Sequence, residues 1–209
     1  MPSPPISPIR LSVQIKEFLL DQIIKGDIQP GERLVESRIA SQMHTSQAPV
    51  RDAIRELGMV GLIEIRRNKG AVVRAFDRDV LVQIYAVRAE LEGMAVELAA
   101  FQNGRSVGAE LLDLCRKMET ATNAGNLAKF IRLNSAFHRC IVLASGNGPL
   151  LEIWDRLDIQ SRTAMNVTRS KNDFDAIHSE HRAIADAVAK GDGVAARQVL
   201  ATHVRRVAC

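Results

Sequence analysis

The chain contains little of what marks a disulfide-stabilised or membrane-embedded protein. Its three cysteines, Cys115, Cys140 and Cys209, have neither the number nor the spacing of a disulfide framework or a zinc ribbon. No apolar run approaches the ~18 residues that a membrane-spanning helix requires. These absences exclude a secreted disulfide scaffold, and we expect a cytoplasmic protein without a membrane partner.

Aromatic residues are also scarce, because the chain has one tryptophan and one tyrosine. Trp154 and Tyr85 stand at helix-compatible positions, and we expect them to pack rather than to recognise a ligand. The 46% of hydrophobic residues suffices for one large or two modest cores. The start of the chain is rich in proline and serine, so residues 1–8 are predicted to form a disordered leader.

The positive charge is concentrated in one segment. The formal net charge is only +4, but residues 62–74 hold a single acid, Glu64, and four bases, Arg66, Arg67, Lys69 and Arg74. Such a cluster suits contact with a polyanion, although a solvated hairpin explains it equally well.

Residues 44–57 indicate a helix that reads DNA. Thr45 and Ser46 are good N-cap residues, Pro49 falls in the first turn, and apolar residues recur at helical spacing at Val50, Ala53, Ile54 and Leu57. The other side carries Gln47, Arg51 and Arg55, whose donors suit base edges and phosphates. Residues 35–43 predict a short preceding helix that ends in a tight turn, so the two helices form a helix-turn-helix.

The flanking residues extend this pair to a winged helix-turn-helix domain over residues 9–76. An amphipathic helix is predicted over residues 9–25, followed by a turn at 29–31. Residues 63–66 alternate apolar and polar side chains, residues 68–70 form a hairpin turn, and residues 71–73 return as a second strand. We therefore expect a two-stranded wing.

Residues 77–209 are predicted to form an all-helical bundle, so the fold class is mainly α. Six helices are expected, over residues 79–101, 107–124, 127–144, 149–168, 174–190 and 193–207. Glycine- and asparagine-rich breaks mark several of their ends, at residues 103–104, 125–126, 145–148 and 191–193.

One basic residue stands where the helical pattern requires an apolar one. The buried face of helix 79–101 is predicted from the stripe of Ile84, Leu91, Ala95 and Leu98, and at a period of 3.6 residues this stripe includes Arg88. A buried guanidinium needs an anionic partner, which is either an internal carboxylate such as Glu92 or a bound acid.

Three histidines and one asparagine are predicted to point into the same bundle. Asn134 and His138 lie four residues apart on one apolar stripe, while His181 and His203 lie on the stripes of the last two helices. Imidazole nitrogens and carbonyl oxygens bind zinc, nickel, manganese or iron, so the pattern favours a metal site over separate core histidines. The remaining histidines, His44 and His178, are expected to be exposed.

These features resemble a known family along nearly the whole chain after the leader. The matching N-terminal positions are Gly26, Pro30-Gly31-Glu32-Arg33-Leu34, Glu36, Ile39-Ala40, Pro49-Val50-Arg51-Asp52-Ala53-Ile54-Arg55, Leu57, Gly61-Leu62-Ile63 and Gly70. The matching C-terminal positions are Val87-Arg88, Leu91-Glu92, Ala136-Phe137-His138-Arg139, Ala144-Ser145-Gly146-Asn147, Glu180-His181-Arg182-Ala183-Ile184, Gly191-Asp192 and His203. The chain thus resembles GntR-type transcriptional regulators of the fatty-acid-responsive FadR subfamily, which carry a helical FCD effector domain.

The resemblance implies a homodimer that binds double-stranded DNA at a pseudo-palindromic operator. It places operator contacts at Arg33, Ser37, Arg38, Ser46, Gln47, Ala48, Arg51 and Arg55, and at Lys69 and Gly70 of the wing tip. The usual Ser-Arg-Thr-Pro of the family is Ser46-Gln47-Ala48-Pro49 here, and Ser37 replaces a common arginine. Because Gln47 pairs with adenine where arginine prefers guanine, preference at that base is expected to differ by ~1–3 kcal/mol.

The resemblance also implies a site for a divalent metal ion, zinc before nickel, manganese or iron, held by one aspartate and three histidines. Here Asn134 takes the aspartate position beside His138, His181 and His203. An asparagine brings no negative charge, so we expect weaker metal binding and a small organic acid effector that balances the cation and contacts Arg88.

We therefore expect a transcriptional regulator, not an enzyme, whose DNA affinity responds to a small organic acid. One alternative is that the bundle is a ligand-free dimerisation module, and another is that the histidine cluster forms a metal-dependent hydrolase. A hydrolase needs a general base, and Glu180 is expected to point away from the cluster because it neighbours His181 in sequence.

Overall fold

The computed structural model describes residues 8–59, 61–66, 70–75, 78–157, 159–169 and 173–206. The chain divides into two compact units, residues 1–75 and 76–209. The predicted leader, apart from Pro8, lies outside the described residues, as do Lys69 and Cys209. None of the described helices combines the length and the apolar character needed to cross a membrane.

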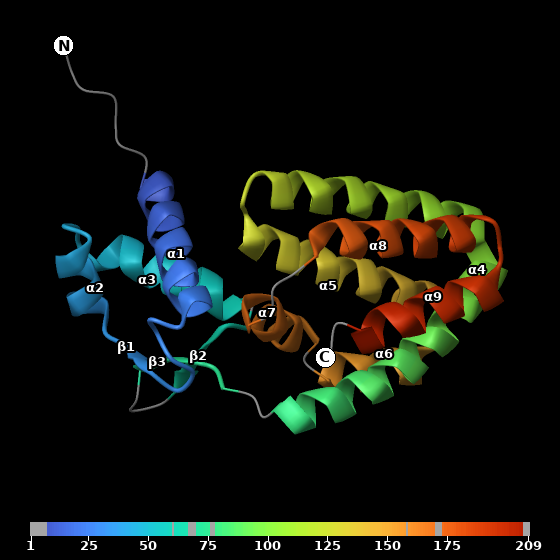
Figure 1. The fold of residues 1–209 in the computed structure, drawn as a ribbon, viewed down its shortest axis with the longest axis horizontal. Helices are drawn as coiled ribbons and strands as arrows, with labels where there is room; N and C mark the ends of the chain where they lie inside the picture. The colour runs from blue at the N-terminus through green and yellow to red at the C-terminus, as the bar shows by residue number, and fades with distance from the viewer. Residues whose placement is uncertain are drawn as a thin grey trace, which may run out of the picture. The chain divides into compact units, whose positions relative to one another are not determined.

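The described residues of the first unit form three helices and a small antiparallel sheet, whose arrangement is drawn in Figure 1. Its helices are α1 (Pro8–Lys25), α2 (Glu36–Gln42) and α3 (Gln47–Met59). The strands β1 (Arg33–Leu34), β2 (Ile63–Arg66) and β3 (Gly70–Val73) follow the order β1-β3-β2, with Arg33 opposite Val72 and Ile63 opposite Val73.

The two predicted strands of the wing are present as β2 and β3, but the sequence prediction missed β1, a third strand that pairs with β3. Two residues are too short to show the alternation of a strand, so the pattern alone gives no signal. The pairing is fixed instead by the chain on either side, where Gly31 N donates to Val73 O at 2.8 Å and Val73 N donates to Glu32 O at 2.9 Å.

Apolar residues at helical spacing build the core of this unit. Val50, Ala53 and Leu57 of α3 are 0% exposed, as are Ile15 and Leu19 of α1. An ion pair between α1 and α3 joins Lys16 Nζ to Glu56 Oε2 at 2.6 Å. The buried side of α3 leaves its opposite side free for contact with a partner.

The second unit is a helical bundle built around one long helix. Its helices are α4 (Arg78–Asn123), α5 (Leu127–Ala144), α6 (Gly148–Arg156), α7 (Ile159–Arg169), α8 (Phe174–Ala189) and α9 (Gly193–Arg206). α5, α8 and α9 pack against α4, and α5 and α8 run alongside its second half (Figure 1). The prediction of a mainly α fold, with a winged unit before a helical bundle, is confirmed.

Short polar side chains begin three helices of the bundle. Asn126 accepts a hydrogen bond from Lys129 N at 3.0 Å, Asn147 from Leu150 N at 3.1 Å and Asp173 from Ala176 N at 3.0 Å. Each cap satisfies a backbone donor that the first helical turn leaves without a partner.

The break expected at residues 103–104 is present as a kink inside α4, where Asn103 takes the non-helical φ −145° and ψ 33°. One other predicted helix boundary differs from the structure. The single helix expected over residues 149–168 is split into α6 and α7, although no glycine or proline marks the break. Arg162 Nε donates to Leu157 O at 2.6 Å, so a side chain satisfies the carbonyl there.

Glycine brings α4 and α8 into close contact after the bend. A Cβ atom on Gly108 would lie 2.5 Å from Ala189 Cβ, and one on Gly104 would lie 2.4 Å from Val188 O. Neither position has room for a side chain, so these two glycines set the spacing of the helices that carry the site described below.

Candidate metal centre and nucleic-acid interface

The residues predicted to read DNA lie on the exposed side of α3. Gln47, Ala48, Arg51 and Arg55 are all exposed. Both Nε and Nη2 of Arg51 donate to Glu36 Oε2 on α2, at 3.1 and 2.9 Å. Arg55 Nη1 lies 3.7 Å from Asp52 Oδ1. The helix therefore presents amide and guanidinium donors to its surroundings.

The other predicted DNA contacts are also on the surface. Arg33, Ser37, Arg38, Ser46 and Gly70 are exposed, while Lys69 lies outside the described residues. Gly70 has φ +71°, and a Cβ atom there would lie 3.6 Å from Nε of Arg33, so β1 carries a guanidinium to the start of β3. His44 is exposed in the turn after α2, as predicted, and has φ 50°.

Three histidines from three helices meet inside the second unit. His138 of α5, His181 of α8 and His203 of α9 are 0%, 0% and 2% exposed. One ring nitrogen from each lies within 4.8 Å of the others, and the described residues contain no other such group of histidine, cysteine or acidic side chains. The predicted convergence of these three imidazoles therefore occurs.

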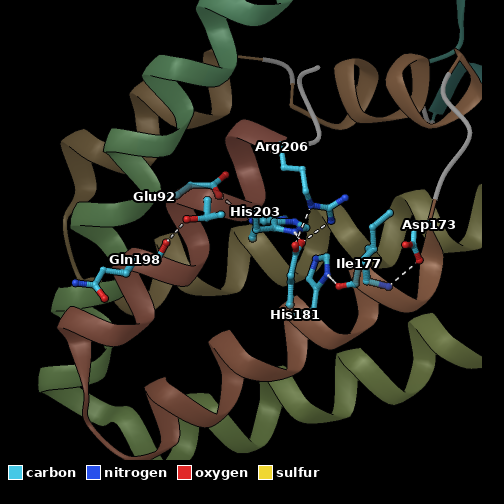
Figure 2. A network of polar contacts seen from close by, with 11 residues as sticks. Glu92, Asp173, Ile177, His181, Gln198, His203 and Arg206 are labelled. Atoms are coloured by element: carbon cyan, nitrogen blue, oxygen red, sulfur yellow. Dashed lines mark hydrogen bonds and ion pairs between the residues drawn. The ribbon is translucent and has the colours of Figure 1, made fainter.

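Each imidazole is held through its Nδ1 atom. His138 Nδ1 lies 2.7 Å from Glu92 Oε2, His181 Nδ1 lies 2.7 Å from Ile177 O, and His203 Nδ1 lies 2.7 Å from Glu180 Oε2. Figure 2 shows His181 with the carbonyl of Ile177 and His203 on the neighbouring helix. The Nε2 atoms of His138 and His181 are buried without a hydrogen-bond partner. This arrangement fits a metal ion, because metal-binding histidines usually anchor the second nitrogen on a carboxylate or carbonyl.

Glu92 of α4 organises one side of the cluster. Its Oε1 accepts from Arg88 Nε and from Trp154 Nε1, both at 2.7 Å, and its Oε2 faces His138. The side chain is 0% exposed. Trp154 is buried, as predicted, but it also donates a hydrogen bond that the sequence did not indicate. Glu92 thus links α4, α5 and α6.

Burial away from water keeps the imidazoles neutral. Burial by itself raises the pKa of Glu92, but the positive charge of Arg88 and the contact with His138 lower it well below its usual range. Burial lowers the pKa of His138 to about 4 even though Glu92 raises it. Burial also lowers the pKa of His181 and of His203. Neutral imidazole is the form that binds metal.

Arg88 and Asn134 border a small cavity beside the histidines. The cavity of about 20 Å³ is lined by Tyr85, Arg88, Phe130, Asn134, His138, Thr163, Asn166, Val167, Ile177 and His203. Arg88 is 1% exposed, and its predicted internal partner Glu92 is present, yet its Nη2 atom is buried without a hydrogen-bond partner. One guanidinium nitrogen therefore remains available to an anion.

Three expectations about the second unit need correction. Glu180 was expected to point away from the cluster, but it contacts His203 Nδ1 and also accepts from Arg206. The two residues lie on different helices, so no local spacing could show the contact. His178 is half-buried rather than exposed, and its Nε2 lies 2.9 Å from Thr122 Oγ1.

The third correction concerns α4. Ile84, Leu91 and Leu98 of its predicted core stripe are only half-buried, while Ala95 is buried. The core face instead holds Leu81, Tyr85, Arg88, Ala89, Glu92, Ala95, Val96 and Ala99. The sequence pattern placed Arg88 correctly in the core. It also assigned Ile84, Leu91 and Leu98 to the buried face, although these three residues are only half-buried. Thr163 and Asn166 of α7 line the cavity without any signal in the sequence.

Comparison with known proteins agrees with this architecture. Residues 11–73 match the family described as bacterial regulatory proteins of the gntR family, and residues 83–206 match the FCD domain. A "Probable D-xylose utilization operon transcriptional repressor" of Paenarthrobacter nicotinovorans is 35% identical over 191 residues, which cover 91% of this chain and 84% of that protein.

Two Escherichia coli proteins are also similar. The HTH-type transcriptional repressor GlaR is 28% identical over 196 residues, which cover 90% of this chain and 89% of the repressor. The solved structure of McbR/YncC has a TM-score of 0.61 and 26% identity, and the match covers 94% of each chain. Both of the named repressors are transcriptional regulators, so the comparisons favour a regulator over the hydrolase alternative. The chain belongs to the GntR family of DNA-binding transcriptional regulators and carries a C-terminal FCD domain.

Proposed function

We propose that a small organic acid, bound together with a divalent metal ion in the helical domain, controls the affinity of this regulator for its operator. Residues 9–76 would read DNA and residues 77–209 would bind the ligand and pair two copies. The observation that carries the proposal is the meeting of three buried imidazoles, two with unpartnered Nε2 atoms, beside the unpartnered Nη2 atom of Arg88.

The donor set suits the metal ion. His138, His181 and His203 would supply nitrogen ligands, and Asn134, buried in the wall of the same cavity, would supply an amide oxygen. Zinc fits this set best among zinc, nickel, manganese and iron, since it takes imidazole with few demands on geometry. The bound ion supplies a positive centre that attracts a carboxylate.

Because the cavity is small, binding of an organic acid would require the surrounding helices to change their packing. A volume of about 20 Å³ holds a single water molecule, so an organic acid enters only when the surrounding helices rearrange. α7 contributes Thr163, Asn166 and Val167 to the wall. An acid that prefers the wider packing shifts the population toward it, by no more than its difference in affinity for the two states.

The DNA-reading part of the proposal rests on the exposed edge of α3. Gln47 and Arg51 would read base edges, and Arg33, Ser37, Arg38, Ser46, Ala48, Arg55, Lys69 and Gly70 would contact the backbone or the groove walls. A homodimer would place two such edges on the half-sites of a pseudo-palindromic operator.

The metal ion is tested first, by elemental analysis of the purified protein. We expect a stoichiometric divalent ion, its loss in His138→Ala, and its retention in His178→Ala. His178 is a matched control because it lies on α8, three residues before His181, with its Nε2 bonded to Thr122. An ion-free protein that also fails to take up added zinc, nickel or manganese would contradict this part of the proposal.

The effector is tested by a thermal-shift screen of small carboxylates against the metal-loaded protein. An acid that binds the native state raises the melting temperature by mass action. The same acid should change the affinity for the DNA upstream of the protein's own gene. If no carboxylate does either, the bundle is a ligand-free dimerisation module.

Operator reading is tested with Arg51→Ala on the same upstream DNA over a range of salt concentrations. Loss of a bidentate base contact should cost ~1–3 kcal/mol and relax the sequence preference. Lys25→Ala is the control, because Lys25 is an exposed base of the same unit that pairs with Asp21 on α1. Equal effects of the two variants on DNA binding would show that Arg51 does not read the operator sequence.

A further inference from the structure

The first unit contains a cleft that takes part neither in the metal centre nor in the reading edge of α3. The cleft is bordered by α1, α2 and β1, and its volume is about 180 Å³, against about 20 Å³ for the cavity beside the histidines. At ~30 Å³ for each water molecule, this volume corresponds to about six waters. The cleft exists because α1 and α2 each pack against α3 more closely than against one another.

The floor of the cleft is apolar. It consists of Leu19 of α1, Leu34 of β1 and Ile39 of α2, which are 0%, 6% and 7% exposed. Phe18 and Ile28, which also line the cleft, are half-buried. A cavity of ~150 Å³ lined by leucine, isoleucine and phenylalanine is large enough to bind benzene. An aromatic ring or a short hydrocarbon chain therefore suits this floor.

Two arginines line the same cleft, and neither forms an ion pair with another described residue. They are Arg33 of β1 and Arg38 of α2, and both are exposed. Other bases in the described part of this unit do face a carboxylate, namely Lys16, Lys25, Arg51, Arg55 and Arg66. The cleft thus combines an apolar floor with positive charge that no carboxylate pairs within the described chain.

Two acids, Asp27 and Glu32, line the cleft from the segment between α1 and β1. Glu32 Oε2 accepts a hydrogen bond from Gln29 N at 3.0 Å, so a backbone donor already holds this carboxylate. The acids and Arg38 belong to different walls, because Arg38 is part of α2. The wall formed by α2 is therefore the one that suits an anion.

We propose that this cleft binds a small amphipathic anion, with its apolar body on the floor and its carboxylate at Arg38 and Gln42. These two residues lie four positions apart, so they share one side of α2, and both line the cleft. Hydrogen bonds from a guanidinium to a carboxylate are roughly twice as strong as those between neutral groups. Such a site discriminates against an alcohol of the same shape, which has no charge, and against acetate, which has no apolar body.

Binding of the anion opposes DNA binding directly. Arg33 and Arg38 are among the proposed contacts to the operator, and a guanidinium that holds a carboxylate is not available to a phosphate. This route needs neither the metal ion nor a change in the helical bundle. The effect on DNA rests on the proposed role of Arg38 in operator binding, whereas binding of the anion itself does not.

The test is calorimetric titration of the purified full chain with 3-phenylpropionate. We expect saturable binding that persists in the presence of a metal chelator, and at least about tenfold weaker binding of 3-phenylpropanol. Arg38→Gln should weaken the binding of 3-phenylpropionate by a similar factor. The matched control is Arg55→Gln, which removes an exposed arginine of the same unit that does not line the cleft. It should bind 3-phenylpropionate as wild type does.

A second variant, Val35→Asp, tests the site without removing a proposed DNA contact. Val35 lines the cleft, is 40% exposed and occupies the N-cap position of α2. Aspartate is a favourable N-cap residue, so the variant should keep the far-UV circular dichroism and the melting temperature of wild type or exceed the latter. Its negative charge repels a carboxylate in the cleft, and binding of 3-phenylpropionate should weaken at least about tenfold.

The effect on DNA is measured by fluorescence anisotropy with the DNA upstream of the protein's own gene. Adding 3-phenylpropionate should release this DNA from wild type and from Arg55→Gln, while acetate and 3-phenylpropanol at the same concentration should not. Release by all three compounds, or by none, would contradict direct competition at Arg38.

Several results of the titration would overturn the inference as a whole. They are the absence of saturable binding, equal binding of the alcohol, unchanged binding in both Arg38→Gln and Val35→Asp, and loss of binding when the chelator is added. Failure here leaves the metal and effector experiments unaffected, because the cleft shares no residue with the histidine cluster or with the lining of its cavity.

Discussion

Arg51 on α3 directs two of its guanidinium N–H groups at one carboxylate oxygen of Glu36 on α2, at 3.1 and 2.9 Å. The side chains are 50% and 31% exposed, so the pair adds little to the stability of the fold. Its effect is to restrict the rotamers of a long side chain on the proposed reading edge. If Arg51 reads DNA as proposed, Glu36 acts on recognition through the orientation of the Arg51 side chain.

Replacing Glu36 tests whether this residue orients Arg51 or only repels DNA, because the two roles predict opposite changes in affinity for the operator. In Glu36→Gln we expect roughly tenfold weaker binding to the operator, equivalent to ~1.4 kcal/mol. Binding to random DNA should strengthen, because a negative charge is removed near the phosphates. Fluorescence anisotropy with operator and scrambled duplexes measures both, with Asp21→Asn as the control on α1. Tighter binding to both duplexes would mean that Glu36 only repels DNA.

We expect that loss of the Glu92 carboxylate costs more stability than loss of any other buried group in the bundle. Glu92→Gln leaves the charge of Arg88 buried without an ionic partner, so we expect a loss of ~3–5 kcal/mol in the free energy of unfolding. Trp154→Phe removes only one of the donors to Glu92 and should cost ~1 kcal/mol. Urea denaturation followed by far-UV circular dichroism compares the two. Equal losses would show that Arg88 finds another anion.

Placing a carboxylate at position 134 should strengthen binding of the proposed metal ion. The amide of Asn134 brings no negative charge to a site whose imidazoles are neutral, and Asn134→Asp supplies one. We expect the affinity for zinc to rise by at least about tenfold, in line with the 10–100-fold effects of changes near metal sites. Competition with a chromogenic chelator gives the number. An unchanged or lower affinity would place residue 134 outside the coordination shell.

The close approach of α4 and α8 predicts that Gly108 does not tolerate even a methyl group. In Gly108→Ala the new Cβ would lie 2.5 Å from Ala189 Cβ and 2.6 Å from Ala189 Cα, so we expect a loss of ~1–3 kcal/mol from overpacking. Gly148→Ala is the control, since nothing lies within 4 Å of its Cβ position. That change should stay within about 0.5 kcal/mol in thermal or urea unfolding. Similar results for both would contradict the tight packing.

Patterns local to one helix were predicted well from the sequence. The turn and helix at residues 44–57, the exposed position of Gln47 and Arg51, and the burial of Arg88 follow from helical period and capping chemistry. The inward direction of His138, His181 and His203 follows from the apolar stripes on which they stand. Each of these inferences needs only the neighbours within a few residues.

Features that depend on two separate segments were missed or misjudged. The contact of Glu180 with His203 joins residues that are 23 positions apart, and β1 exists only because β3 pairs with it. At the break between α6 and α7, the side chain of Arg162 donates a hydrogen bond to the carbonyl of Leu157. No glycine or proline marks this break in the sequence. In α4, the stripe of Ile84, Leu91 and Leu98 is as apolar as a core face, so periodicity could not tell an inner side from an outer one.

The sequence by itself determined which residues have the chemistry to read DNA and to bind a metal ion, and the order of a winged unit before a helical bundle. These properties are encoded in spacing and residue type within single elements. Only the tertiary structure decided that Glu92 and Glu180 anchor the imidazoles, that the cavity beside Arg88 is small, and that α4 is apolar on two sides. Such facts arise from how distant helices pack, which local periodicity does not record.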